Sequence, residues 1–203
     1  LVAALSGDNQ LWRMHAQRLL VERGKADVVP ALLALAADPK VDAIGLNPGA
    51  IHALWTLRGL GALDEAGASV AISAFRHASP GVRRNALEAA PRDAKTAAAI
   101  LDARLLSDTD ARVRLSAFLA LSEVPRSGLV ANSIASALAE GATEGDRWLG
   151  DARTSAASAH DLEFLKALAG REFPKAPSTS TIAVVGRVAE HYARGGPADS
   201  VGS

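Results

Sequence analysis

The chain has 203 residues, with 22 basic and 22 acidic side chains and no cysteine. The balanced charge argues against a strongly basic nucleic-acid-binding domain, and the missing thiols exclude disulfides, thiolate metal sites and cysteine nucleophiles. Hydrophobic residues make up 49% and aromatic residues only 4% of a chain rich in alanine, so we expect an ordered, all-α protein.

One short pattern recurs along the chain. An apolar residue follows a turn, an arginine often comes next, and an alanine stands four positions after the apolar residue. The copies cover residues 12–16, 49–53, 82–86, 113–117 and 148–152. The second and fifth copies are degenerate. Each copy opens an apolar stripe at helical spacing, and a fixed repeat of this kind predicts stacked helix pairs.

Second helices are expected between the copies, over residues 28–35, 70–75, 100–106 and 129–138. Turns with Asp or Ser as expected N-caps separate the helices at residues 6–9, 79–81, 107–110 and 141–145. The loop over 38–48 is longer than its counterparts. A stretch rich in Pro, Ser and Thr over 173–181 predicts a break before a last helix over 180–194.

These elements predict an α-α superhelix of about five helix pairs over residues 1–172. The break, a terminal helix and the start of a further repeat are expected over residues 173–203. The chain begins at Leu1, already in helical pattern and without Met, which predicts that it is a piece of a longer protein.

Three arginines share one position of the pattern: Arg13, Arg83 and Arg114. We expect each guanidinium to pair with an Asp of the turn between helices and to hold neighbouring repeats together. The alternative is that this arginine column binds an acidic partner.

Another set of positions, two, three and six residues after the apolar residue, is expected to point away from the core and to form one docking strip. Its members are Met14, His15, Arg18, Ile51, His52, Trp55, Arg84, Asn85, Glu88, Leu115, Ser116 and Leu119. Aromatic and Met side chains with a polar rim are typical of interface centres, so the amino-terminal end of the strip is the expected docking surface. The alternative is that the 38–48 loop or a neighbouring domain covers it. Trp12 and Trp148 fall at apolar positions of their copies, which predicts packing.

Motifs for chemistry are missing. The five histidines show no metal-ligand spacing, although His15 and His52 share a register, and we expect exposed or capping imidazoles. No nucleophile triad has motif support, and Gly59 and Gly61 have no strand before them as a nucleotide-binding turn requires. No cofactor is therefore expected. No apolar run reaches the roughly 18 residues of a membrane span.

The residues Asp110, Val113, Arg114 and Ala117, and again Pro80, Val82, Arg83 and Ala86, resemble the signature of the HEAT repeat. The resemblance covers nearly the whole chain and implies a helical solenoid, but it implies little about function.

A narrower resemblance rests on the stretches Leu11 to Gly24, Ile51 to Gly61 and His191 to Ser200. These look like the HEAT region of large planctomycete-type bacterial proteins, which have a dehydrogenase-like β-propeller before the repeats and a haem-c domain after them. The resemblance implies an exported protein in which this segment links two redox modules. The chain itself contains neither module, and Ala50 stands where the family has Arg before Ile51.

We therefore expect a non-catalytic protein-interaction or inter-domain scaffold, whose partner is a protein or a neighbouring domain of the same chain. One alternative is a HEAT-like nucleic-acid enzyme such as a DNA glycosylase, against which the zero net charge argues. Another is a lyase-like HEAT protein that handles a chromophore.

Overall fold

The computed structural model describes residues 1–63, 65–140, 146–171 and 176–195, and within them every regular element is a helix. The all-α prediction is confirmed. The chain divides into two compact units, Leu1–Pro91 and Arg92–Ser203, which are described separately. None of the described helices is both long and apolar enough to cross a membrane.

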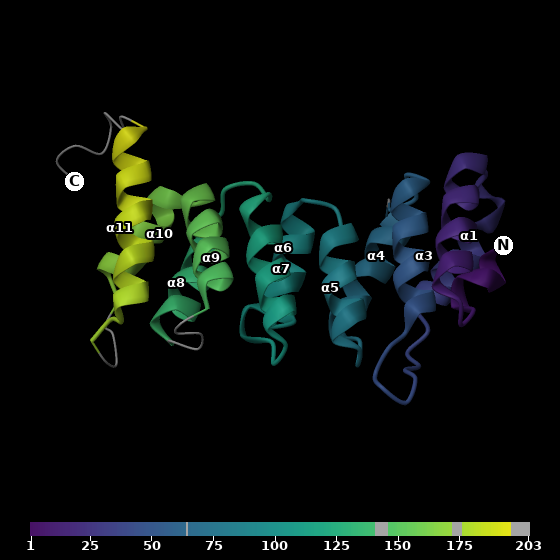
Figure 1. Cartoon of the computed structure of the whole chain (residues 1–203). Coiled ribbons are helices and arrows are strands. Elements are labelled where there is room, and N and C mark those ends of the chain that lie inside the picture. Colours follow the sequence, from purple (N-terminus) through teal and green to yellow (C-terminus); the bar gives the residue numbers. More distant parts are fainter. Residues whose placement is uncertain (64, 141–145, 172–175, 196–203) are drawn as a thin grey trace. The chain divides into compact units, whose positions relative to one another are not determined.

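The first unit is built around α3, which packs against α1, α2 and α5 (Figure 1). Within it, α4 packs against α2 and α5. Its helices are α1 (Gln10–Arg23), α2 (Val29–Ala36), α3 (Pro48–Gly59), α4 (Glu65–Ser73) and α5 (Pro80–Ala89), with short 3-10 helices η1 (Val2–Ser6), η2 (Ala26–Val28) and η3 (Ala74–Arg76).

In the second unit, α9 packs between α7 and α11, while α8 packs against α6 and α10. The helices are α6 (Ala94–Asp102), α7 (Ala111–Ser122), α8 (Gly128–Ala139), α9 (Arg147–Ala159), α10 (Asp161–Ala169) and α11 (Thr179–Arg194), with the 3-10 helix η4 (Leu105–Ser107). In both units, therefore, a helix packs against the helix two places further along the chain, as α1 does against α3 and α7 against α9.

Polar N-caps fix where the first helix of most pairs begins. Asn9, Asp110 and Asp146 each accept hydrogen bonds from two backbone N–H groups of the first helical turn, and Asn47 accepts one. A cap of this kind is worth about 1 kcal/mol. The prediction fails at Ser79, whose side chain makes no capping bond and whose backbone N–H donates to His77 Nδ1 instead.

The caps also set which residues face the core. In α7, Val113 lies three and Ala117 seven positions after the cap, and both are fully buried. Counted in the same way, α3 buries Ala50 and Leu54, and the positions given by the sequence pattern, Gly49 and Ala53, are buried as well. The hydrogen-bonding cap, rather than sequence similarity, decides the register because it determines the first helical residue.

The packing predicted for Trp12 and Trp148 is wrong. Trp148 is 67% exposed because the cap at Asp146 places Leu149, not Trp148, at the buried position. Trp12 stands at the expected position, but it is 64% exposed because only the short η1 segment lies beside it. Its indole instead lies near the His15 ring, with the ring centroids 6.1 Å apart.

The second helices expected over 28–35 and 129–138 are α2 and α8, within one residue at each end. The helix expected over 70–75 is the end of α4 followed by η3, and the one expected over 100–106 is divided, because α6 ends at Asp102 and η4 begins at Leu105. The last helix begins one residue earlier than expected. The fifth second helix, α10, was not identified from the sequence. The longer loop is also present between α2 and α3, where the Asn47 side chain donates to the carbonyls of Asp38 and Lys40. The turn at 141–145 and the further repeat expected after residue 195 lie outside the described residues, as does part of the break at 173–181.

Candidate functional site

The arginine column has one recurring geometry. In each of the three copies, Nη1 donates to two backbone carbonyls, six and five residues earlier in the turn that precedes the helix. The bonds run from Arg13 to Gly7 (2.7 Å) and Asp8 (3.0 Å), from Arg83 to His77 (2.8 Å) and Ala78 (3.1 Å), and from Arg114 to Asp108 (2.6 Å) and Thr109 (3.2 Å).

The acceptors of these six bonds are main-chain carbonyls. A helical side chain leans toward the amino-terminal end of its helix, which brings the guanidinium over its own turn. The carbonyls there have no partner within the helix, so a cation that bonds two of them fastens the turn to the helix that follows.

The column is interrupted in the second and fifth copies. The position four residues after the cap holds Ile51 in α3 and Gly150 in α9. The sequence pattern had placed this gap at Ala50, one residue too early. Ile51 is half-buried, and its Cδ1 lies against Gly81 of α5. An apolar contact thus stands where the other copies have an arginine.

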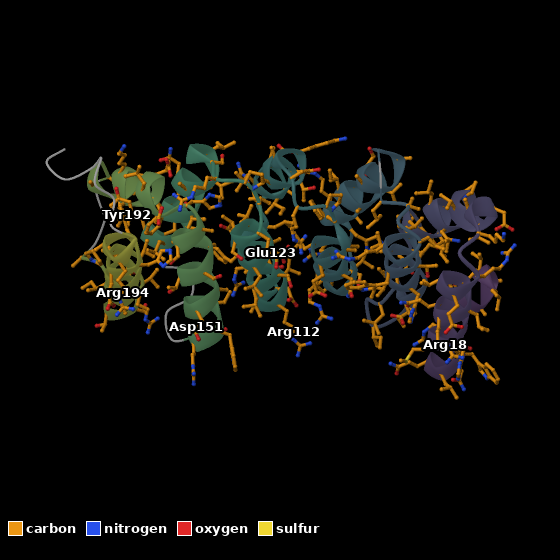
Figure 2. The ribbon with its side chains drawn as sticks, turned by 90° about the horizontal axis from the view of Figure 1, so that it is seen from above. Arg18, Arg112, Glu123, Asp151, Tyr192 and Arg194 are labelled. Atoms are coloured by element: carbon orange, nitrogen blue, oxygen red, sulfur yellow. The ribbon has the colours of Figure 1, made fainter. Side chains whose placement is uncertain are left out.

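A groove with a volume of about 590 Å³ lies between α1 and α3 in the first unit. Four residues of the predicted docking strip line it: Met14, Arg18, His52 and Trp55. The α1 side of the groove also includes Gln10, Gln17, Val21 and Glu22. Met14 is 56% exposed, and the labelled Arg18 extends away from its helix (Figure 2).

The rest of the predicted strip does not join this groove. His15 lies with Trp12 along a separate apolar hollow of about 310 Å³. Arg84 forms an ion pair with Glu88 one turn later on α5, with an N–O distance of 3.5 Å. The outward orientation expected for Asn85 and Ser116 is wrong, because both side chains are buried. Of the residues six positions after the apolar residue, Arg18 and Leu119 are exposed, whereas Trp55 and Glu88 are half-buried.

The Trp55 ring is held in place from α5. Its Nε1–H donates to Asn85 Oδ1 at 2.7 Å, and Asn85 Nδ2 in turn donates to the Gly81 carbonyl at 2.8 Å. Arg58, on the same helix as Trp55, lies over the ring with its Cζ 5.7 Å from the centroid. Its Nη1 donates to the Glu88 carbonyl at 2.6 Å. The indole is therefore a fixed apolar surface whose only donor is already used.

His52 links the two walls of the groove. Its Nδ1 lies 2.7 Å from Gln17 Oε1 on α1. Burial lowers the pKa of His52, and the positive charge of Arg13 lowers it further, so the neutral imidazole is favoured near pH 7. Because an amide oxygen only accepts, the proton lies on Nδ1 and Nε2 carries a lone pair. No described residue bonds Nε2, which leaves an acceptor at the groove.

A close approach of helices forms one end of the groove. A β-carbon added to Gly59 of α3 would lie 2.6 Å from Val21 Cγ2 of α1, far inside van der Waals contact. Glycine therefore allows the two helices to meet there, and Met14 and Trp55 also line the groove.

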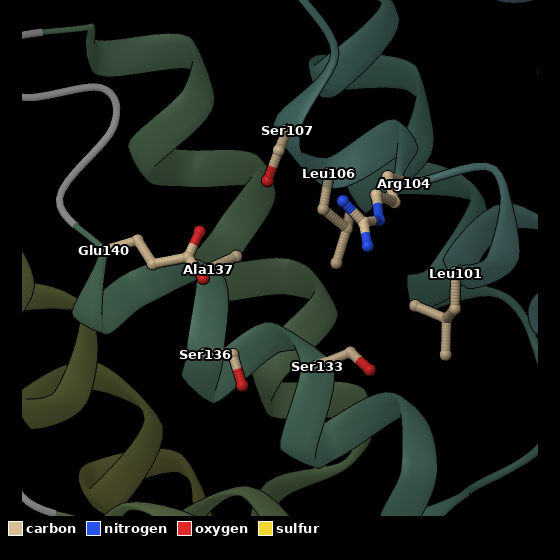
Figure 3. Close-up of a pocket in the computed structure, with 8 residues that line it drawn as sticks. All are labelled: Leu101, Arg104, Leu106, Ser107, Ser133, Ser136, Ala137 and Glu140. Atoms are coloured by element: carbon tan, nitrogen blue, oxygen red, sulfur yellow. The ribbon is translucent and has the colours of Figure 1, made fainter.

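A second hollow, with a volume of about 500 Å³, lies in the second unit between the end of α6, η4 and α8 (Figure 3). Its polar lining includes Arg104, Ser133, Ser136 and Glu140, and Leu101 and Leu106 provide apolar surface. Nothing in the repeat pattern indicated this hollow, because its residues come from the turn after α6 and from the second helix of the next pair.

Two buried polar side chains of the second unit, His160 and Asp161, have hydrogen-bond or ion-pair partners within the fold. His160 is fully buried: its Nδ1 accepts from the Ser127 backbone N–H, and its Nε2 lies 3.0 Å from the Leu121 carbonyl. This histidine is buried rather than exposed, contrary to expectation, and although it stands at the N-cap position of α10 its ring makes no capping bond there. Arg126 pairs at 2.8 Å with Asp161, which is 7% exposed.

Arg153 of α9 is 6% exposed and stands where the other copies have a small or aliphatic residue. Its Cζ lies 5.5 Å from the centroid of the Phe118 ring, and its Nε has no hydrogen-bond partner. Burial lowers the pKa of Arg153, and the charge of Arg114 lowers it further, while Asp146 opposes the shift. The cation is thus poorly compensated.

The described residues hold no group of three or more His, Asp or Glu side chains placed to bind a metal ion. No protein-family model matches the chain, and no curated protein gives a significant match. The structure therefore defines a class only: an all-α protein whose described residues form helices packed against one another, with a mixed apolar and polar groove in its first unit and a polar hollow in its second.

Proposed function

We propose that the chain is a stretch of HEAT-like helical repeats that acts as a non-catalytic interaction module, and that the groove between α1 and α3 receives a segment of a protein partner. The repeat assignment is supported by the arginine column, because three helices bond the turn before them at the same two offsets. A repeated contact of this kind is expected when one helix-turn-helix unit is used several times.

The observation that carries the interaction role is the fixed indole of Trp55 beside an exposed Met14. A rigid aromatic anchor and an adaptable Met side chain, rimmed by polar groups, are the composition of interface centres. The open lone pair of His52 Nε2 adds a directional requirement. The partner segment would place an apolar side chain against Trp55 and an adjacent N–H or O–H donor toward His52.

A photo-crosslinking amino acid placed at position 14 in the source cells tests this proposal. The same amino acid at Leu129, an exposed apolar residue of α8 in the other unit, serves as the matched control. We expect a discrete protein adduct from position 14 alone. The identified partner, purified, should bind the native chain and bind a Met14→Glu variant at least tenfold more weakly. Met14 is a suitable position because its exposed side chain contributes little to folding.

Two results would refute the proposed docking surface. If position 14 gives no adduct that position 129 lacks, or if the partner binds Met14→Glu as tightly as the native chain, the groove is not the docking surface. Binding to duplex DNA that falls steeply as salt is raised would instead favour the nucleic-acid alternative.

The wider proposal, that this module links domains of an exported redox protein, is supported by sequence resemblance alone. Sequencing the encoding gene beyond both ends of the chain tests it. A haem-attachment motif downstream would support the link, and flanking segments without a propeller or haem motif would refute it.

A further inference from the structure

Two side chains of opposite charge face the hollow of the second unit from different elements. Arg104 follows α6, and Glu140 follows the last residue of α8. The close-up in Figure 3 shows the guanidinium and the carboxylate both directed toward the space between them. Neither side chain makes a hydrogen bond or ion pair with a described residue. The two charges are therefore available to a molecule placed between them.

Arg104 and Glu140 each occupy a position that is locally unfavourable for that type of residue. Arg104 has φ of 55° and is the only described non-glycine residue in the left-handed region. Glycine is the usual residue there, because a β-carbon clashes with the backbone. Glu140 places a negative charge at the carboxyl end of α8, where the helix dipole is itself negative. Unfavourable local choices that converge on one hollow are typical of binding sites rather than of scaffolds.

Two serines of α8, Ser133 and Ser136, also line the hollow. Ser133 Oγ donates to the Leu129 carbonyl and Ser136 Oγ donates to the Asn132 carbonyl, each at 2.9 Å. A hydroxyl has a single proton, so both oxygens retain only lone pairs for a ligand. Together with Glu140, they make one side of the hollow rich in acceptors, which an ammonium group with its three N–H donors would satisfy.

We propose that this hollow binds a small zwitterion, specifically a free aliphatic α-amino acid. Arg104 would hold the carboxylate, while Glu140 and the serine hydroxyls would receive the ammonium group. Leu101 and Leu106 supply the apolar surface for the side chain. A volume of about 500 Å³ lies within the range of roughly 300–1,000 Å³ that is usual for small-molecule sites. This site is independent of the groove between α1 and α3, because it lies in the other unit.

Calorimetric titration of the whole chain with three related probes tests the assignment. Free L-leucine has both charges, leucine amide lacks the carboxylate, and N-acetyl-leucine lacks the ammonium group. We expect saturable binding of L-leucine and at least tenfold weaker binding of each of the other two. No binding of L-leucine, or equal binding of all three probes, would overturn the proposal.

Variants assign the two charges. Arg104→Gln and Glu140→Gln should each weaken L-leucine binding at least tenfold. Arg112→Gln, which changes an exposed arginine of α7 directed away from its helix (Figure 2), should leave binding unchanged. Arg104→Gly separates binding from folding, because glycine suits the left-handed backbone: this variant should melt at a higher temperature than the native chain and yet lose binding. L-leucine binding that survives in Arg104→Gly or in Glu140→Gln would overturn the proposal.

Discussion

Replacing Arg114 by Ala tests the structural role of the arginine column. The substitution removes a charged donor that bonds two turn carbonyls, at 2.6 and 3.2 Å. A hydrogen bond from a charged group contributes about 1.5–3 kcal/mol. The second bond is long, and losing Arg114 relieves its repulsion of the buried Arg153. We therefore expect a net loss of about 2 kcal/mol.

For a protein of this length, about 2 kcal/mol corresponds to a fall in melting temperature of roughly 4–8 °C. The matched control is Arg112→Ala, two residues earlier in α7, where the side chain is exposed. Both variants lose one arginine from the same helix, so net charge and helix propensity change equally. Differential scanning calorimetry should show a shift for Arg112→Ala that corresponds to at most about 0.5 kcal/mol. Equal shifts in the two variants would refute a structural role and favour the binding alternative. Arg126 is unsuitable as a control because it pairs with the buried Asp161.

Gly59→Ala should lower stability by about 1–3 kcal/mol, because its methyl group would press on Val21. Gly186→Ala in α11 should instead raise stability by up to about 1 kcal/mol, since nothing lies within 4 Å of the added β-carbon. Melting shifts of the same sign in these two variants would contradict the close approach of α1 and α3. Arg153→Met should raise the melting temperature, because Met keeps the contact with Phe118 and removes a poorly compensated cation. A lower melting temperature would show that the charge is stabilising. The lowered pKa of His52 means that the unfolded chain takes up this proton first, near pH 6.5, so the native protein loses stability as pH falls below about 7. The urea midpoint of His52→Gln should therefore fall less than that of the native chain between pH 7.5 and roughly 5.5, and identical falls would refute the assignment.

Most helices of this protein, though not α10, could be predicted from the sequence alone, because the signals that start and stop a helix are local. Asp110 caps the helix that its turn predicted, and α11 begins within one residue of the expected position. Apolar residues at helical spacing identified the buried Val82 and Val113. These signals act over a few residues, so reading them requires no knowledge of distant packing.

The groove was foreseen in part for the same reason. Met14 and Arg18 are one turn apart on α1, and their common face follows from helical periodicity. Where the register was wrong by one residue, the prediction failed, since one residue rotates a side chain by about 100° around a helix. Trp148 and Leu149 exchanged places in this way.

Only the tertiary structure decided which residues of different helices come together. Asn85 became a buried partner of Trp55 because α5 packs against α3, although the two residues are 30 positions apart in the chain. Arg104 and Glu140 face one hollow because α8 packs beside α6 and η4, a contact with no trace in either local sequence. Helix propensity and capping are settled within a turn or two of backbone, whereas these pairings depend on how closely neighbouring helices approach, which is set by side-chain volumes at the contact.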